Sequence, residues 1–112
     1  MKIYLAGPMR GVPNFNFPAF AEATKILREE GHEVFSPAEK GEEKILSESP
    51  DVQNDIAFRR NVFEIDLTWI CRHADAVALL PGWEKSSGAR AEKATAEAIG
   101  LTIMVLGVKY HV

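Results

Sequence analysis

The sequence predicts an α/β domain in which helices pack on a parallel sheet of four to five strands. Short apolar runs alternate along the chain with longer segments whose apolar residues recur every three or four positions. A strand, a helix and a second strand follow one another at the start of the chain, and this order is typical of parallel pairing. A length of 112 residues fits one domain, so we interpret residues 1–112 as a single unit.

The first half of the chain contains two predicted strands joined by a helix. The apolar run Lys2–Ala6 predicts a buried strand, because a Gly-Pro pair ends it. Apolar residues at three- and four-residue steps predict a helix over Pro18–Glu30, with proline at its first position and Gly31 after its end. The run His32–Phe35 predicts the second strand. The segment between the first strand and the helix is rich in Gly, Pro and Asn, which predicts a loop.

A polar segment, Ala38–Asp55, follows the second strand. It contains six acidic residues and little apolar periodicity. A loop of this length in a compact domain is usually functional or disordered. The sequence leaves two interpretations open, a solvated insertion and a lid over a binding site.

The strongest helix signal covers Ile56–His73. Its apolar stripe steps by four, three and four residues through Phe58, Val62, Ile65 and Trp69. Asp66 lies on or beside this stripe, where a carboxylate is unusual. One interpretation pairs Asp66 with an arginine such as Arg59 or Arg60. The other places it in a crevice, where burial raises its pKa and lets it act as a general acid.

The second half of the chain returns to the sheet twice. Ala76–Leu80 predicts a third strand and Leu101–Leu106 a fourth, with an alanine-rich helix over Ser87–Ile99 between them. The loop Pro81–Ser87 therefore lies where a parallel strand gives way to a helix, which is where α/β proteins bind ligands. Asp75, just before the third strand, is interpreted either as a site residue or as a cap on the preceding helix.

Glu92 is the candidate nucleophile of this region. Ser86 or Ser87 can cap the helix, which puts Glu92 in the second turn, where the helix dipole favours an ionised carboxylate. The alternative is an ordinary solvated glutamate on a surface helix. Arg10 and the backbone amides of Ser86–Gly88 can hold a phosphate, because an arginine and a helix N-terminus both attract anions. Otherwise Arg10 is a surface charge.

Composition and charge narrow the class of protein. A net charge of −3 and a pI near 5.6 give no basic surface for a nucleic acid polymer. One cysteine excludes an internal disulfide and fits a cytoplasmic protein, and three dispersed histidines predict no metal site. No apolar run is long enough to cross a membrane, so no membrane partner is expected. The first loop lacks the glycine pattern of dinucleotide sites, so no cofactor is expected.

Three stretches together resemble the nucleoside 2-deoxyribosyltransferase superfamily, which includes phage and bacterial proteins and 2′-deoxynucleoside 5′-phosphate N-hydrolase. They are IYLAGPMRG, EIDLTWICRHADAVALL and the Ser-x-Gly-x-x-x-Glu pattern of Ser86, Gly88 and Glu92. The resemblance covers most of the chain. It implies a flavodoxin-like (Rossmann-like) three-layer fold and a homodimer or higher homo-oligomer. Lys93 stands where many relatives have a glycine after the glutamate.

The resemblance implies cleavage or transfer of the N-glycosidic bond of a 2′-deoxyribonucleoside or its 5′-monophosphate. Glu92 is then the nucleophile at the anomeric carbon, Asp66 the acid that protonates the departing base, and Tyr4 the residue that orients the sugar or Glu92. The implied substrate-binding residues are Gly7, Arg10, Gly11, Asp75, Ser86, Ser87 and Gly88. The expected partner is a small-molecule nucleoside or nucleotide. The alternative is a noncatalytic nucleotide-binding protein of the same fold, acting as a sensor or by sequestering its ligand.

Overall fold

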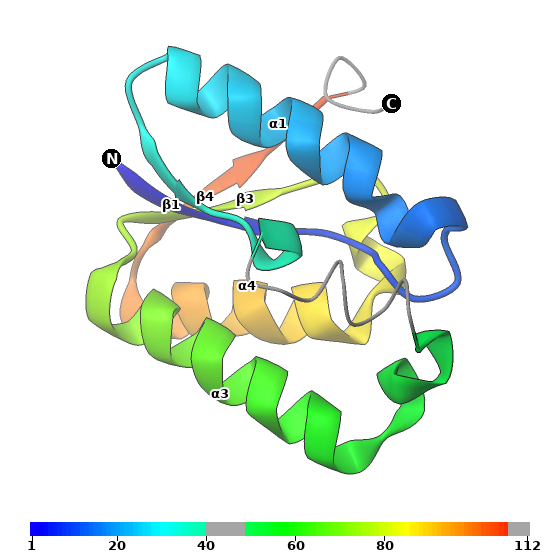
Figure 1. The fold of residues 1–112 in the computed structure, drawn as a ribbon. Helices are drawn as coiled ribbons and strands as arrows, with labels where there is room; N and C mark the ends of the chain where they lie inside the picture. Colours follow the sequence, from blue (N-terminus) through cyan, green and yellow to red (C-terminus); the bar gives the residue numbers. More distant parts are fainter. Residues whose placement is uncertain (40–48, 108–112) are drawn as a thin grey trace.

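The chain forms a parallel sheet between two layers of helices (Figure 1). The computed structural model describes residues 1–39 and 49–107. Within them the strands are β1 (Lys2–Ala6), β2 (Glu33–Phe35), β3 (Ala76–Leu79) and β4 (Thr102–Val105). Their order is β2-β1-β3-β4 and every pairing is parallel. The predicted α/β fold is confirmed, and this strand order is consistent with a flavodoxin-like sheet.

Helices cover both faces of the sheet. One face carries α1 (Phe17–Glu29), and the other carries α3 (Ile56–His73) and α4 (Ser87–Ile99) (Figure 1). Short 3₁₀ helices lie in the connections: η1 (Pro13–Asn16), η2 (Pro37–Glu39), η3 (Pro50–Asn54) and η4 (Trp83–Lys85). The predicted bounds of α3 and α4 are confirmed, and those of α1 move by one residue. Among the described helices, none has the length and apolarity needed to span a membrane.

Alternate residues of β1 point to the two helical layers. Ile3 and Leu5 belong to the core on the α1 side, where they pack with Phe20. Tyr4 and Ala6 belong to the core on the side of α3 and α4. Successive side chains of a strand point to opposite faces, so a strand buried on both faces needs a continuous apolar run. The same alternation directs Tyr4 toward the layer that carries Asp66 and Glu92.

The buried face of α3 differs from the predicted one at a single position. The predicted apolar stripe included Ile65, but Ile65 is 46% exposed, whereas Asp66 and Ile70 are buried. Phe58, Val62 and Trp69 of the predicted stripe are half-buried, so only Ile65 departs from the prediction, and Asp66 takes its place on the inward side. The cause is that α3 packs against α4 and β1, which buries Asp66 and Ile70 and leaves Ile65 outside the contact. Apolar residues flank Asp66 on both sides, so their periodicity alone does not fix which flank is buried.

The polar segment Ala38–Asp55 is described at its two ends. Pro50–Asn54 forms η3, from which Gln53 and Asn54 line a pocket. Residues 40–48 lie outside the described residues. The choice between a lid and a solvated insertion therefore stays a prediction for that part of the chain.

Candidate functional site

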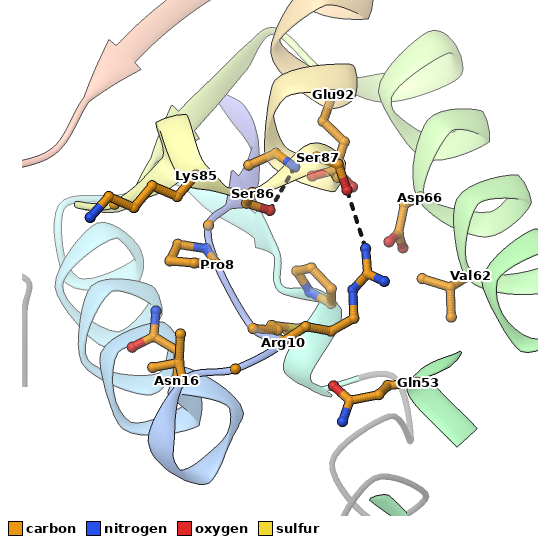
Figure 2. Close-up of a pocket in the computed structure, with 18 of the residues that line it drawn as sticks. Pro8, Arg10, Asn16, Gln53, Val62, Asp66, Lys85, Ser86, Ser87 and Glu92 are labelled. Carbon is orange, nitrogen blue, oxygen red and sulfur yellow. Dashed lines mark hydrogen bonds between the residues drawn. The ribbon is translucent and has the colours of Figure 1, made fainter. Parts of the chain in front are cut away.

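A pocket of about 830 Å³ lies at the carboxyl ends of β1 and β3 (Figure 2). The connection after β1 crosses one face of the sheet through α1, and the connection after β3 crosses the other face through α4. Connections that diverge in this way leave a crevice between the two strand ends. The loop after β1, η1, η3, α3 and the start of α4 all contribute to the walls. The predicted ligand loop Pro81–Ser87 forms part of the same walls.

Three buried side chains from different elements meet in this pocket. Tyr4 comes from β1, Asp66 from α3 and Glu92 from α4, and their exposed fractions are 0%, 2% and 7%. The Tyr4 hydroxyl donates a hydrogen bond of 2.7 Å to Oε2 of Glu92. These are the three residues predicted to be catalytic, and the fold brings them together although Tyr4 and Glu92 are 88 positions apart.

Asp66 is a buried carboxyl group with unused hydrogen-bonding capacity. Its Oδ1 atom has no hydrogen-bond partner among the residues that the structure describes. Burial raises the pKa of Asp66 to about 6, and the nearby Tyr4 hydroxyl opposes this rise only in part. The alternative ion pair with Arg59 or Arg60 is not formed within the described chain. Asp66 therefore faces the pocket as a group that exchanges its proton close to neutral pH.

Tyr4 is held in its protonated form. Burial, reinforced by the carboxylates of Glu92 and Asp66, raises the pKa of Tyr4 well above its ordinary value. Its ring is stacked on Phe35 with 5.4 Å between the ring centroids, which fixes its direction. Tyr4 is thus a fixed hydrogen-bond donor to Glu92.

The N-terminus of α4 and the side chain of Arg10 meet on one side of the pocket. Ser86 is the N-cap, since its Oγ accepts a 3.1 Å hydrogen bond from the Ala89 amide. Ser87 Oγ accepts a 3.1 Å hydrogen bond from Nη2 of Arg10, as Figure 2 shows. The amides of Ser87 and Gly88 belong to the first turn, where no intrahelical acceptor exists. An arginine and a helix N-terminus together form a site suited to a phosphate.

Gly7 lets the loop after β1 pass close to the end of β3. A Cβ atom at this position would lie 2.8 Å from Leu80 Cβ, which is shorter than the contact distance between non-bonded carbon atoms. We expect Gly7→Ala to lower the free energy of unfolding by about 1–3 kcal/mol, because the loop or the strand end must move. Urea denaturation measures this change. Gly107→Ala is the control, since its added Cβ meets no described atom within 4 Å, and equal stability of both variants would contradict the expectation.

The loop before α1 has an unusual backbone. Asn14, Phe15 and Asn16 have φ angles of 53°, 52° and 62°. This left-handed region costs a non-glycine residue about 1–3 kcal/mol, and asparagine tolerates it better than most residues. The turn brings Asn16 to the pocket, where it is 5% exposed.

Asn16 and Gln53 are pocket residues that the sequence did not identify. The signal for Asn16 was its place in a loop rich in Pro, Gly and Asn, since asparagine is common in left-handed turns. That signal predicts a turn and says nothing about a pocket. Gln53 lies in a polar segment without periodicity, so the sequence contains no signal for it.

Two residues singled out from the sequence lie outside the pocket. Asp75 accepts a 2.8 Å hydrogen bond from the Lys2 amide, at the edge of the sheet opposite the carboxyl ends of the strands. Neither Asp75 nor Lys93 is among the described residues that line the pocket. Asp75 lies away from the pocket because it precedes β3 rather than following it, and its substrate-binding role stays a prediction. Lys93 pairs with Glu97 at 3.0 Å and lies 5.3 Å from the centroid of the Trp83 ring.

The remaining predicted substrate-binding residues all line the pocket: Gly7, Arg10, Gly11, Ser86, Ser87 and Gly88. Metal binding has no comparable support. Within residues 1–39 and 49–107, no group of three or more His, Cys, Asp or Glu side chains is placed to hold a metal ion.

Fold and pocket define a flavodoxin-like α/β protein with a ligand-sized pocket where its parallel strands diverge. The chain belongs to the family described as a domain of unknown function, DUF4406, whose profile matches residues 1–105. No curated protein and no solved structure shows a significant match to the chain. The family match includes every described residue that lines the pocket.

Proposed function

We propose that the protein breaks the N-glycosidic bond of a 2′-deoxyribonucleoside 5′-monophosphate through a covalent bond to Glu92. The observation that carries this proposal is the buried cluster in which Tyr4 donates to Glu92 at 2.7 Å and Asp66 faces the same pocket. A volume of about 830 Å³ is large enough for a nucleotide. The resemblance of the sequence to the nucleoside 2-deoxyribosyltransferase superfamily supports the same reaction.

The two carboxyl groups have the different properties that this reaction needs. An oxygen of Glu92 attacks the anomeric carbon while the bond from this carbon to the base nitrogen breaks, and its electron pair leaves with the base. Asp66 supplies the proton that the departing base takes up, since a pKa of about 6 lets it exchange a proton near neutral pH. Water or a second base then attacks the same carbon, releases Glu92 and returns a proton to Asp66.

The charges around the pocket support a phosphorylated substrate. Among the described lining residues, Arg10, Arg59 and Lys85 are cationic and only Asp66 and Glu92 are acidic. This local excess of positive charge contrasts with the net charge of −3 for the whole chain. A 5′-phosphate fits best beside Arg10 and the N-terminus of α4, where a cation and free amides converge.

Arg10→Ala should weaken the binding of 5′-monophosphates and leave nucleoside binding nearly unchanged. Loss of charge-assisted hydrogen bonds to a phosphate reduces affinity about 10- to 100-fold. Calorimetric titration of the same base as nucleoside and as monophosphate measures the two effects. Arg72→Ala is the matched control, because Arg72 is exposed in the last turn of α3 and does not line the described pocket. An equal loss of affinity for the nucleoside and the monophosphate in Arg10→Ala would mean that the phosphate binds away from Arg10.

Release of free base tests the reaction itself. The purified protein is incubated with the common deoxyribonucleosides and their 5′-monophosphates, with and without a second base, and the products are separated by chromatography. We expect base release from a monophosphate. A requirement for the second base would define a transferase, and release in water alone a hydrolase. Nucleotide binding without base release from any compound would contradict the proposal and favour the noncatalytic nucleotide-binding protein.

A further inference from the structure

The pocket contains two amide side chains, the buried Asn16 and the half-buried Gln53, that the proposed reaction does not use. Asn16 comes from η1, and its buried Nδ2 donor has no hydrogen-bond partner in the described part of the chain. Gln53 comes from η3, and its buried Oε1 acceptor also lacks a partner there. Both residues line the pocket. Buried polar atoms are nearly always paired in native proteins, so these two indicate a ligand that pairs with them.

Helix capping does not explain why Asn16 is buried. It occupies the N-cap position of α1, where asparagine usually accepts a hydrogen bond from an amide of the first turn. Its backbone is left-handed instead, and among the described contacts its side chain makes no cap hydrogen bond. The side chain is therefore left available to the pocket.

The phosphate and the reacting carbon already have their own groups in the proposed complex. Arg10 and the start of α4 are assigned to the phosphate, and Glu92 and Asp66 to the sugar carbon. Figure 2 shows Asn16 and Gln53 on opposite sides of Arg10, with both separated from Ser86. The part of a nucleotide that remains for these amides is the base.

The composition of the pocket suits a nucleobase. Apolar side chains, among them Val12, Phe20 and Phe58, line it together with the neutral amides Asn16 and Gln53. A nucleobase has flat apolar faces and an edge of hydrogen-bond donors and acceptors, so it matches apolar walls that contain a few amides. A neutral amide binds a charged group no better than water does, so these amides do not favour a second charged group on the ligand.

We propose that Asn16 is a specificity-determining residue whose Nδ2 donates a hydrogen bond to an acceptor on the base edge. This inference rests on the proposed function, because it assigns the base of the bound nucleotide. The common bases differ in their arrangement of donors and acceptors, so the protein should prefer one monophosphate over the others.

Two substitutions test Asn16 without disturbing its backbone. Asn16→Gly removes the side chain and suits the left-handed conformation. Asn16→Asp keeps the shape and replaces the Nδ2 donor with an oxygen acceptor. Asn14→Gly is the matched control, because Asn14 is in the same left-handed turn but is exposed and does not line the described pocket. Calorimetric titration uses the common deoxyribonucleoside 5′-monophosphates and 2-deoxyribose 5-phosphate, which has no base.

Asn16→Gly should lower the affinity for the preferred monophosphate about 10- to 100-fold and leave the affinity for 2-deoxyribose 5-phosphate unchanged. Asn16→Asp should also lower the affinity for the preferred monophosphate. It should shift the preference toward a base that carries a hydrogen-bond donor at the matching position. Asn14→Gly should change the affinity for neither ligand. Equal weakening of both ligands by Asn16→Gly would assign Asn16 to the loop or the sugar, and unchanged affinities would exclude a contact. Either result overturns the inference.

These titrations separate the inference from the proposed reaction. If the wild-type protein binds monophosphates without releasing base, the reaction is contradicted, and the comparison of Asn16 variants still decides base recognition. If base is released and Asn16→Gly retains the wild-type preference, the reaction stands and the role of Asn16 is overturned. A wild-type protein that binds none of the monophosphates overturns both.

Discussion

Glu92→Gln should reduce the rate of base release by about 10⁴-fold or more, as expected for loss of a catalytic nucleophile. The glutamine amide keeps the shape of the side chain and can accept the 2.7 Å hydrogen bond from Tyr4. Its uncharged oxygen is a poor nucleophile, so the covalent bond to the sugar no longer forms. Chromatography of the preferred monophosphate measures the rate, and calorimetry shows that the nucleotide still binds.

Glu97→Gln is the matched control for this experiment. Glu97 lies on the same helix, is exposed and pairs with Lys93 at 3.0 Å outside the described pocket. This variant should release base at the wild-type rate. Full activity of Glu92→Gln would remove Glu92 from the mechanism. A folded Glu92→Gln protein that has lost nucleotide binding as well would assign Glu92 to binding rather than to bond cleavage.

Asp66→Asn should gain stability relative to the wild type as the pH rises from about 4 to about 7. Burial raises the pKa of Asp66 from 3.8 to about 6 in the folded protein. Below the lower value the carboxyl group is neutral in folded and unfolded chains alike, so it causes no pH dependence. Between the two values the unfolded chain releases the proton first, and the folded state loses stability. Above about 6 this loss is complete and amounts to about 3 kcal/mol.

Asparagine at position 66 does not ionise, so the variant escapes this loss. Urea unfolding of both proteins at about pH 4 and about pH 7.5 should show a stability difference that grows by about 2 kcal/mol in favour of Asp66→Asn, because part of the loss has already occurred at pH 4. Asp51→Asn, which replaces an exposed carboxylate in η3, should show no such growth. A difference for Asp66→Asn that stays constant over this range would contradict the raised pKa. The wild-type protein thus keeps an acid in its pocket at the expense of stability.

Local patterns along the chain were sufficient to predict the fold class and the described long elements. Each strand is an apolar run bounded by Gly, Pro or a helix end, and α4 begins at a serine cap and ends before Gly100. These signals depend on a few neighbouring residues, so the sequence contains them in full. The pattern Ser86, Gly88 and Glu92 likewise identified pocket residues before the fold was known. The cytoplasmic location and the homo-oligomeric state stay predictions.

The tertiary structure alone decided which side chains face one another. Tyr4 meets Glu92 because β1 pairs with β3 and α4 packs across them, contacts that join residues 88 positions apart. The packing of α3 turned Asp66 inward and left Ile65 46% exposed, and the raised pKa of Asp66 follows from that burial. A left-handed turn brought Asn16 into the pocket. Burial and desolvation depend on contacts between distant segments, and no pattern within a single segment records them.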